Sequence, residues 1–82
     1  VLFRSREYLM LALRMSEGIK ISVYKELFGK DPTVLYKSVI ARYEQTGHLN
    51  RDDESFYLTI DGMDISNTII IDFFECLDAI EI

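Results

Sequence analysis

With 82 residues, 49% of them hydrophobic, the chain suits a single domain with a modest core and is too apolar for a disordered tail. Its longest apolar runs fall far short of the ~20 residues of a membrane span, so we expect a cytosolic protein. The formal net charge of −5 disfavours a nucleic-acid partner, and the single cysteine, Cys76, excludes an internal disulfide and a metal site built on several cysteines.

The start of the chain has the character of a segment cut from a longer protein. Val1 is not an initiator methionine, and residues 1–5 show no clear pattern. We therefore interpret residues 1–5 as a linker or a cloning remnant and expect residues 6–82 to form one domain.

The first predicted element is a helix over residues 6–15. Its apolar residues cover several sides of the helix, and such a helix is usually covered on several sides. We therefore expect part of it to meet protein that lies outside this domain. The face that recurs at helical spacing is formed by Tyr8, Leu11, Ala12 and Met15.

A short strand and a short helix follow. Gly18 interrupts the helical pattern, and residues 19–21 alternate in the manner of a strand. Ser22 then offers an N-cap for a helix over residues 23–28, which Gly29 closes.

A longer helix is predicted from Pro32 to Thr46. Asp31 can accept hydrogen bonds from the free N–H groups of the first turn, and a proline at the first position gives up no needed donor. Gly47 can take the left-handed conformation after the last turn. The buried stripe of this helix is expected to be Leu35, Val39, Ile40 and Tyr43.

The period of the apolar residues then changes from that of a helix to two. Residues 48–51 and 55–58 flank the polar turn at residues 52–54, which predicts a β-hairpin. Thr59 or Asp61 is expected to cap a last helix. Residues 69–71 could locally be a strand, but the length of the segment and its i, i+4 pairs favour a helix. The buried face of this helix is expected to contain Met63, Ile69, Ile70, Phe73, Phe74 and Leu77.

This order of elements predicts a mainly α fold with a small β-hairpin, similar to a winged helix-turn-helix domain. Such a fold can bind DNA, bind protein or only pack, so individual residues must decide. DNA binding needs clustered Lys and Arg on the long helix and on the hairpin. The helix offers Lys37 and Arg42 against Glu44, and the hairpin tip is acidic. A protein-interaction module therefore remains the stronger alternative within this fold.

The sequence contains no pattern that marks catalysis. The four glycines are scattered, so they form no phosphate-binding loop, and no serine stands in a Gly-x-Ser-x-Gly context. The carboxylates of the last helix lie on its polar side without a specified pairing. We expect no catalytic residue and no metal ligand in this chain, and a buried or half-buried thiol for Cys76.

Two side chains are candidates for ligand binding. Arg14 lies at the end of the apolar first helix, where its guanidinium can hold either a helix C-terminus or a ligand carboxylate. His48 is the only histidine and lies where a helix gives way to a strand, so a ring nitrogen could bind a metal or haem iron. A structural role is the competing interpretation for both residues, because no second His or Cys stands at ligand spacing.

Three segments taken together resemble one family. They lie in the same order and at the same spacing as in the C-terminal domain of oxygen-independent coproporphyrinogen III oxidases and related haem chaperones. The likeness spans about residues 6–74. One departure is Ala12, where the family pattern has glycine within Leu-Gly-Leu-Arg. The segments are residues 7–14 with Glu17-Gly18, then residues 47–49, then residues 58–62 with Ser66-Asn67 and Phe73-Phe74.

The resemblance implies a division of labour within a larger protein. Members of that group have a radical S-adenosylmethionine barrel before this domain, with a Cys-x3-Cys-x2-Cys motif that holds a [4Fe–4S] cluster. This chain lacks that motif. The resemblance therefore implies that the cluster, S-adenosylmethionine and catalysis belong to the barrel. This domain would pack on the barrel and help to cover a porphyrin or bound haem, and the parent would be either an oxidase or a haem chaperone.

Overall fold

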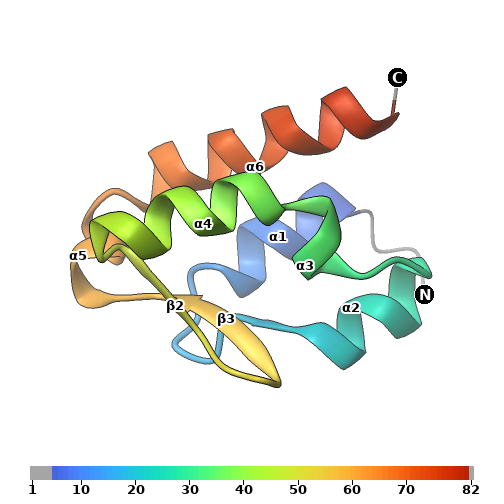
Figure 1. Ribbon diagram of the computed structural model, residues 1–82, viewed down its shortest axis with the longest axis horizontal. Coiled ribbons are helices and arrows are strands. Elements are labelled where there is room, and N and C mark those ends of the chain that lie inside the picture. The colour runs from blue at the N-terminus through green and yellow to red at the C-terminus, as the bar shows by residue number, and fades with distance from the viewer. Residues whose placement is uncertain (1–4, 82) are drawn as a thin grey trace.

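The computed structural model describes residues 5–81, with side chains as far as residue 79. Figure 1 shows α4 and α6 side by side above a small sheet, and these two helices also contact one another. Residues 1–4 of the predicted linker lie outside the described residues. Ser5, the last residue of that predicted linker, is helical. In chain order the elements are α1 (Ser5–Ala12), β1 (Ile19–Lys20), α2 (Ile21–Phe28), α3 (Pro32–Leu35), α4 (Lys37–Thr46), β2 (Leu49–Arg51), β3 (Ser55–Leu58), α5 (Ile60–Asp64) and α6 (Ser66–Glu81).

The predicted mainly α fold with a small hairpin is confirmed. Strands β2 and β3 form the hairpin, with Leu49 opposite Leu58, and β1 pairs antiparallel with the other edge of β3. The sheet order is therefore β1-β3-β2. The hairpin turn closes on the carboxylate of Asp52, which accepts hydrogen bonds from the backbone N–H groups of Glu54 and Ser55 at 2.8 and 2.9 Å.

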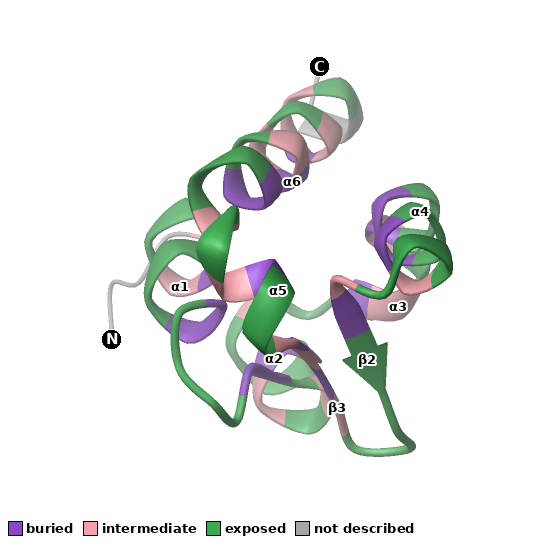
Figure 2. Ribbon diagram, turned by 90° about the vertical axis from the view of Figure 1, so that its left-hand side faces the viewer, coloured by how far each residue is buried: buried purple, intermediate pink, exposed green. Residues whose placement is uncertain are grey.

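One core lies between the helices and the sheet. In Figure 2 the buried residues of α4 and α6 lie on the inward sides of these helices, whereas α5 is mostly exposed. The ring of Phe73 from α6 stacks on the ring of Phe56 of β3, with 6.0 Å between the ring centroids, and packs against the ring of Tyr36, with 5.1 Å between the centroids. This aromatic contact joins the last helix to the sheet, and burying such rings is a main source of stability in a domain this small.

The first helix ends earlier than the apolar pattern predicts. It stops at Ala12, and the chain then turns toward Gly18, instead of continuing helically to Met15. Of the apolar residues of this segment, Leu9, Ala12 and Leu13 are buried, whereas Leu11 and Met15 are exposed. Gly18 has a φ of 67°, and its backbone lies directly against β3 after the turn.

The start of the second helix also differs from the prediction. Helix α2 begins at Ile21, so Ser22 lies inside its first turn and is not the N-cap. Lys20 takes the N-cap position with an extended backbone and no side-chain hydrogen bond. The N–H of Ile21 donates instead to the carbonyl of Glu54 at 2.9 Å, so the hairpin substitutes for a capping side chain. Gly29 ends the helix in the left-handed conformation, as predicted.

The predicted long helix is divided in two at Tyr36. This residue leaves helical geometry, with φ −107° and ψ 22°, and its side chain is fully buried. The sequence pattern did not reveal the division because Val39, Ile40 and Tyr43 are buried at the expected helical spacing. Gly47 has a φ of 81° and ends α4, as predicted.

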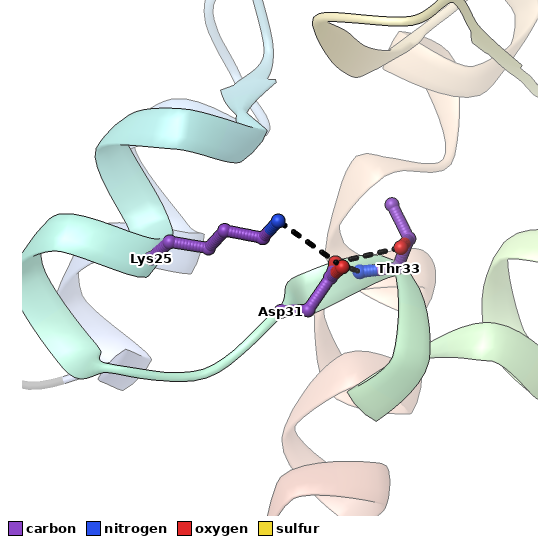
Figure 3. Close-up of polar contacts among 3 residues, drawn as sticks. All are labelled: Lys25, Asp31 and Thr33. Carbon is purple, nitrogen blue, oxygen red and sulfur yellow. Dashed lines mark hydrogen bonds and ion pairs between the residues drawn. The ribbon is translucent and has the colours of Figure 1, made fainter.

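The N-terminus of α3 is held by Asp31, as the Asp-Pro pair predicts. Figure 3 shows its carboxylate between Lys25 of α2 and Thr33 of α3. Oδ1 accepts hydrogen bonds from the backbone N–H of Thr33 at 2.9 Å and from its hydroxyl at 2.6 Å, and Lys25 Nζ lies 3.5 Å from Oδ2. These contacts, those of the Thr33 side chain first, lower the pKa of Asp31.

The last predicted helix is also divided, at Ile65, into α5 and α6. The hydroxyl of Thr59 accepts a hydrogen bond from the N–H of Gly62 at 3.1 Å, so Thr59 and not Asp61 is the N-cap. Residues 69–71 are helical, as their spacing predicts. The expected face of the last helix is buried at Ile69, Ile70, Phe73 and Leu77, and half-buried at Met63 and Phe74.

Among the described residues, none of the helices combines the length and the apolar character that a membrane span requires.

Candidate functional site

Arg14 lies in the turn after α1, not in the helix end where the sequence placed it. Its side chain is exposed, and Nη2 donates a hydrogen bond to Oδ1 of Asn67 at 2.5 Å. Asn67 belongs to the first turn of α6, so the bond ties the end of α1 to the start of α6. The described partner of the guanidinium is therefore a side-chain amide at the start of α6, and not a helix C-terminus. The charged group remains available to a further partner.

His48 lies directly after Gly47, at the start of the hairpin, and is half-buried. Its Nδ1 is 2.7 Å from the hydroxyl of Thr46, and its ring meets the ring of Tyr43 edge-on at 6.2 Å. Its carbonyl accepts a hydrogen bond from the N–H of Thr59 at 3.0 Å. These contacts give His48 a structural role at the junction of α4 and β2.

The structure does not bring the two candidate ligand-binding residues together. Arg14 is tied to α6 through Asn67, whereas the side chain of His48 contacts residues of α4. Within residues 5–79 no three His, Cys, Asp or Glu side chains form a group that could hold a metal ion. The described contacts therefore define no pocket that the two residues share.

An iron–sulfur cluster does not fit the residues of this chain. Iron–sulfur clusters are held by several cysteine thiolates, whereas this sequence has only Cys76. Cys76 is half-buried, as expected, and its thiol donates to the carbonyl of Leu35 at 3.2 Å. It therefore packs α6 against α3.

A polar cluster that the sequence did not predict joins α4 to α6. The hydroxyl of Tyr43 donates a short hydrogen bond to Oδ2 of Asp72, and Nη1 of Arg42 lies 3.4 Å from the same oxygen. Burial, and secondly the hydrogen bond to Asp72, raises the pKa of Tyr43. The hydrogen bond and the ion pair both join α4 to α6, so we interpret the cluster as a structural tie. The sequence contained one signal for this cluster. Tyr43 lies in the predicted buried stripe, and a buried tyrosine needs a hydrogen-bond partner for its hydroxyl.

The surface that would read DNA in a winged helix is not basic. Arg42 on α4 pairs with Asp72, and Arg51 on β2 pairs with Glu44 at 3.3 Å. The hairpin tip carries the exposed acidic residues 52–54. Phosphate groups would be repelled by the tip and would find both arginines already neutralised, so this surface does not favour DNA.

Two shallow hollows lie elsewhere on the surface. One lies between the start of α2 and the hairpin tip, where Lys20 and Lys25 face the acidic tip residues. The other lies between α4 and β2, beside Val34, Lys37 and Arg51. Neither hollow is lined by Arg14 or His48, so neither corresponds to the predicted ligand site.

Exposed apolar side chains gather where α1 lies against α6. Met10 and Ile71 are 40% and 55% exposed, and Leu11 and Met15 follow along α1 and its turn at 56% and 62%. We call Met10, Arg14, Asn67 and Ile71 the α1–α6 seam. The seam fits the expectation that part of the first helix meets other protein.

Comparison with protein families matches most of the chain to a known domain. Residues 4–65 match the family model described as the HemN C-terminal domain. No curated protein and no solved structure matches the chain. The matched range covers α1 to α5, and α6 follows it.

Proposed function

The chain belongs to the HemN C-terminal domain family, and on that basis we propose that it is the accessory domain of a larger coproporphyrinogen oxidase-like protein of haem biosynthesis. In this proposal the domain packs on the catalytic barrel, helps to cover the porphyrin and is not catalytic alone. The family match over residues 4–65 is the observation that carries the proposal.

The exposed apolar residues of α1 and α6 support the packing role. Monomeric proteins rarely leave large contiguous apolar patches in water, and interfaces between domains of one chain resemble those between proteins. Leu11, Met15 and Ile71 are each more than half exposed, although their neighbours Leu9, Leu13 and Ile70 are buried. A barrel placed against this side of the domain would remove these side chains from water.

The cofactors of the proposed parent belong to its other part. With Cys76 as its only cysteine, this chain does not supply the thiolates of a [4Fe–4S] cluster, so we assign the cluster and S-adenosylmethionine to the barrel. We also assign the difference between an oxidase and a haem chaperone to the barrel. A cytosolic location remains part of the proposal.

The test is an anaerobic titration with coproporphyrin III, followed by absorbance, on the full-length protein and on the same protein ended before this domain. We expect the full-length protein to bind saturably and the shortened protein to bind more weakly. Equal affinity and equal turnover of coproporphyrinogen III in both proteins would contradict a covering role. Arg14→Ala in the full-length protein tests whether Arg14 holds a propionate, and His48→Ala tests the alternative iron ligand.

A further inference from the structure

Two contacts hold α1 antiparallel to α6 and bracket the α1–α6 seam. Near the start of α1, Arg6 pairs with Asp78 and lies over the ring of Phe74 at 5.2 Å. Beyond its end, Arg14 donates to Asn67. Met10 is four residues from each arginine, and Ile71 is four residues after Asn67. Helical spacing therefore places Met10 and Ile71 on the stretch of the seam between the two contacts.

The charge of Arg14 is not compensated within the described residues. Arg6, Arg42 and Arg51 each pair with a carboxylate. Arg14 pairs only with the neutral amide of Asn67, although a guanidinium has five N–H donors. In a chain with a net charge of −5, Arg14 is therefore an exposed cation without a described carboxylate partner, and it lies beside exposed apolar side chains. A partner surface that carries a carboxylate would complement it.

We propose that the α1–α6 seam docks on the domain that precedes this one in the same chain, and that Arg14 receives a carboxylate side chain of that domain. The inference rests on the proposed function and names the docking surface and its polar partner. Methionine, aliphatic side chains and an arginine with free donors are the composition of an interface centre.

The preceding domain is the occupant that the observations favour. The family is described as a C-terminal domain, so further protein comes before it, and α1 is the element of this domain nearest to that protein in sequence. A porphyrin propionate would also be a carboxylate. Arg14, however, lies on the open surface of two packed helices and lines neither of the two hollows.

The experiment uses the full-length protein and three charge variants. Arg14→Glu reverses the charge at the seam, and Arg14→Lys keeps it. Lys37→Glu makes the matched charge reversal away from the seam, in the hollow between α4 and β2. Ile71→Asn, with Val34→Asn as its control, tests the apolar part of the seam. Both of these apolar residues are more than half exposed, so neither substitution opens the core. Hydrogen–deuterium exchange read by mass spectrometry, and calorimetric unfolding, are the measurements.

We expect Arg14→Glu and Ile71→Asn to raise exchange by roughly tenfold along residues 5–16, in the first turns of α6 and on one surface of the preceding domain. Arg14→Lys should raise it less, and the two controls should leave it unchanged. Exchange that changes only inside this domain would overturn the docking proposal. So would weaker porphyrin binding by Arg14→Glu without a change in exchange, because the carboxylate would then be that of the ligand.

The wild-type protein separates this inference from the proposed function on which it rests. If this domain and the preceding one unfold in a single calorimetric transition while Arg14→Glu changes nothing, the domains pack through another surface, and only the inference fails. If the wild-type protein shows two independent transitions, packing on the barrel fails, and the proposed function fails with it.

Discussion

The hydroxyl oxygens of Tyr24 and Tyr36 lie 2.7 Å apart inside the core, where both side chains are almost completely buried. Their rings meet edge-on at 5.9 Å, and this contact joins α2 to the break between α3 and α4. A buried hydroxyl requires a hydrogen-bond partner, so the pair explains how two tyrosines are accommodated in an apolar core.

Replacing Tyr24 by phenylalanine should therefore destabilise the domain without changing its shape. The substitution removes one hydroxyl of the pair and leaves that of Tyr36 with one partner fewer. We expect the free energy of unfolding to fall by about 1 kcal/mol, measured by urea denaturation followed by circular dichroism. Tyr57→Phe is the control, because Tyr57 is half-buried and makes no described hydrogen bond. An equal loss in both variants would count against the pair.

Gly18 should tolerate a side chain less well than Gly29, although both have a positive φ. A Cβ at Gly18 would lie 2.1 Å from the carbonyl oxygen of Phe56, whereas a Cβ at Gly29 would meet nothing within 4 Å. Gly29→Ala should cost about 1 kcal/mol for the left-handed backbone alone. Gly18→Ala should cost about 3 kcal/mol or more, because β3 must move. Thermal unfolding compares the two, and equal melting temperatures would show that the strand moves freely.

Acid should weaken the domain partly through Asp31. The contacts with Thr33 and Lys25 lower the pKa of this carboxyl below its value in the unfolded chain. Its contribution is therefore fully present above the unfolded pKa of about 4 and is lost as the pH falls through the lower folded pKa. As the pH is lowered from 5, we expect the melting temperature of Asp31→Asn to fall less than that of the wild type. An equal fall of the melting temperature in both proteins would show that Asp31 makes no such contribution.

The Tyr43–Asp72 hydrogen bond should contribute more to stability than the neighbouring ion pair. Its acceptor is a charged and largely shielded carboxylate, so Tyr43→Phe should cost about 1.5 kcal/mol. Arg42 is 62% exposed and 3.4 Å from the same oxygen, so Arg42→Ala should cost well under about 1 kcal/mol. Chemical denaturation of both variants checks the order, and a larger loss for Arg42→Ala would reverse our interpretation of the cluster.

The pKa of Tyr43 offers a second check on that cluster. Because burial and Asp72 raise it, the stabilisation is complete below the ordinary tyrosine pKa and is lost as the pH rises through the higher folded value. In the wild type, tyrosinate absorbance should therefore contain a late step at alkaline pH. Burial also raises the pKa of Tyr8, so the late step should become smaller in Tyr43→Phe without disappearing. A step of unchanged size would assign it to the other tyrosines.

The sequence predicted the elements that depend on local rules. Asp31 at an N-cap, Gly29 and Gly47 after helices, and the acidic hairpin turn each follow from the conformational preference of one or two residues. The helical prediction for residues 69–71 followed from the length of the segment and from its i, i+4 pairs. These features need no knowledge of what lies on the other side of the core.

The positions where prediction was wrong are those that depend on contacts between distant segments. Helix α1 ends at Ala12, and Gly18 lies against β3 after the turn. Ile21 needs no capping side chain because Glu54 supplies the acceptor. Tyr36 leaves the helix where its ring is buried against Phe73. The candidate site shows the same limit. Arg14 remains a predicted ligand-binding residue, and its position in the turn after α1 could not be read from the sequence.

Helix α6 has a consequence for how the domain is delimited. The family match ends at residue 65, yet Ile69, Phe73 and Leu77 form one wall of the core, and Phe73 covers both Tyr36 and Phe56. A polypeptide that stopped at the family boundary would leave these two aromatic rings open to water and would aggregate. The part of this chain that is recognised by similarity is therefore smaller than the part that forms its core.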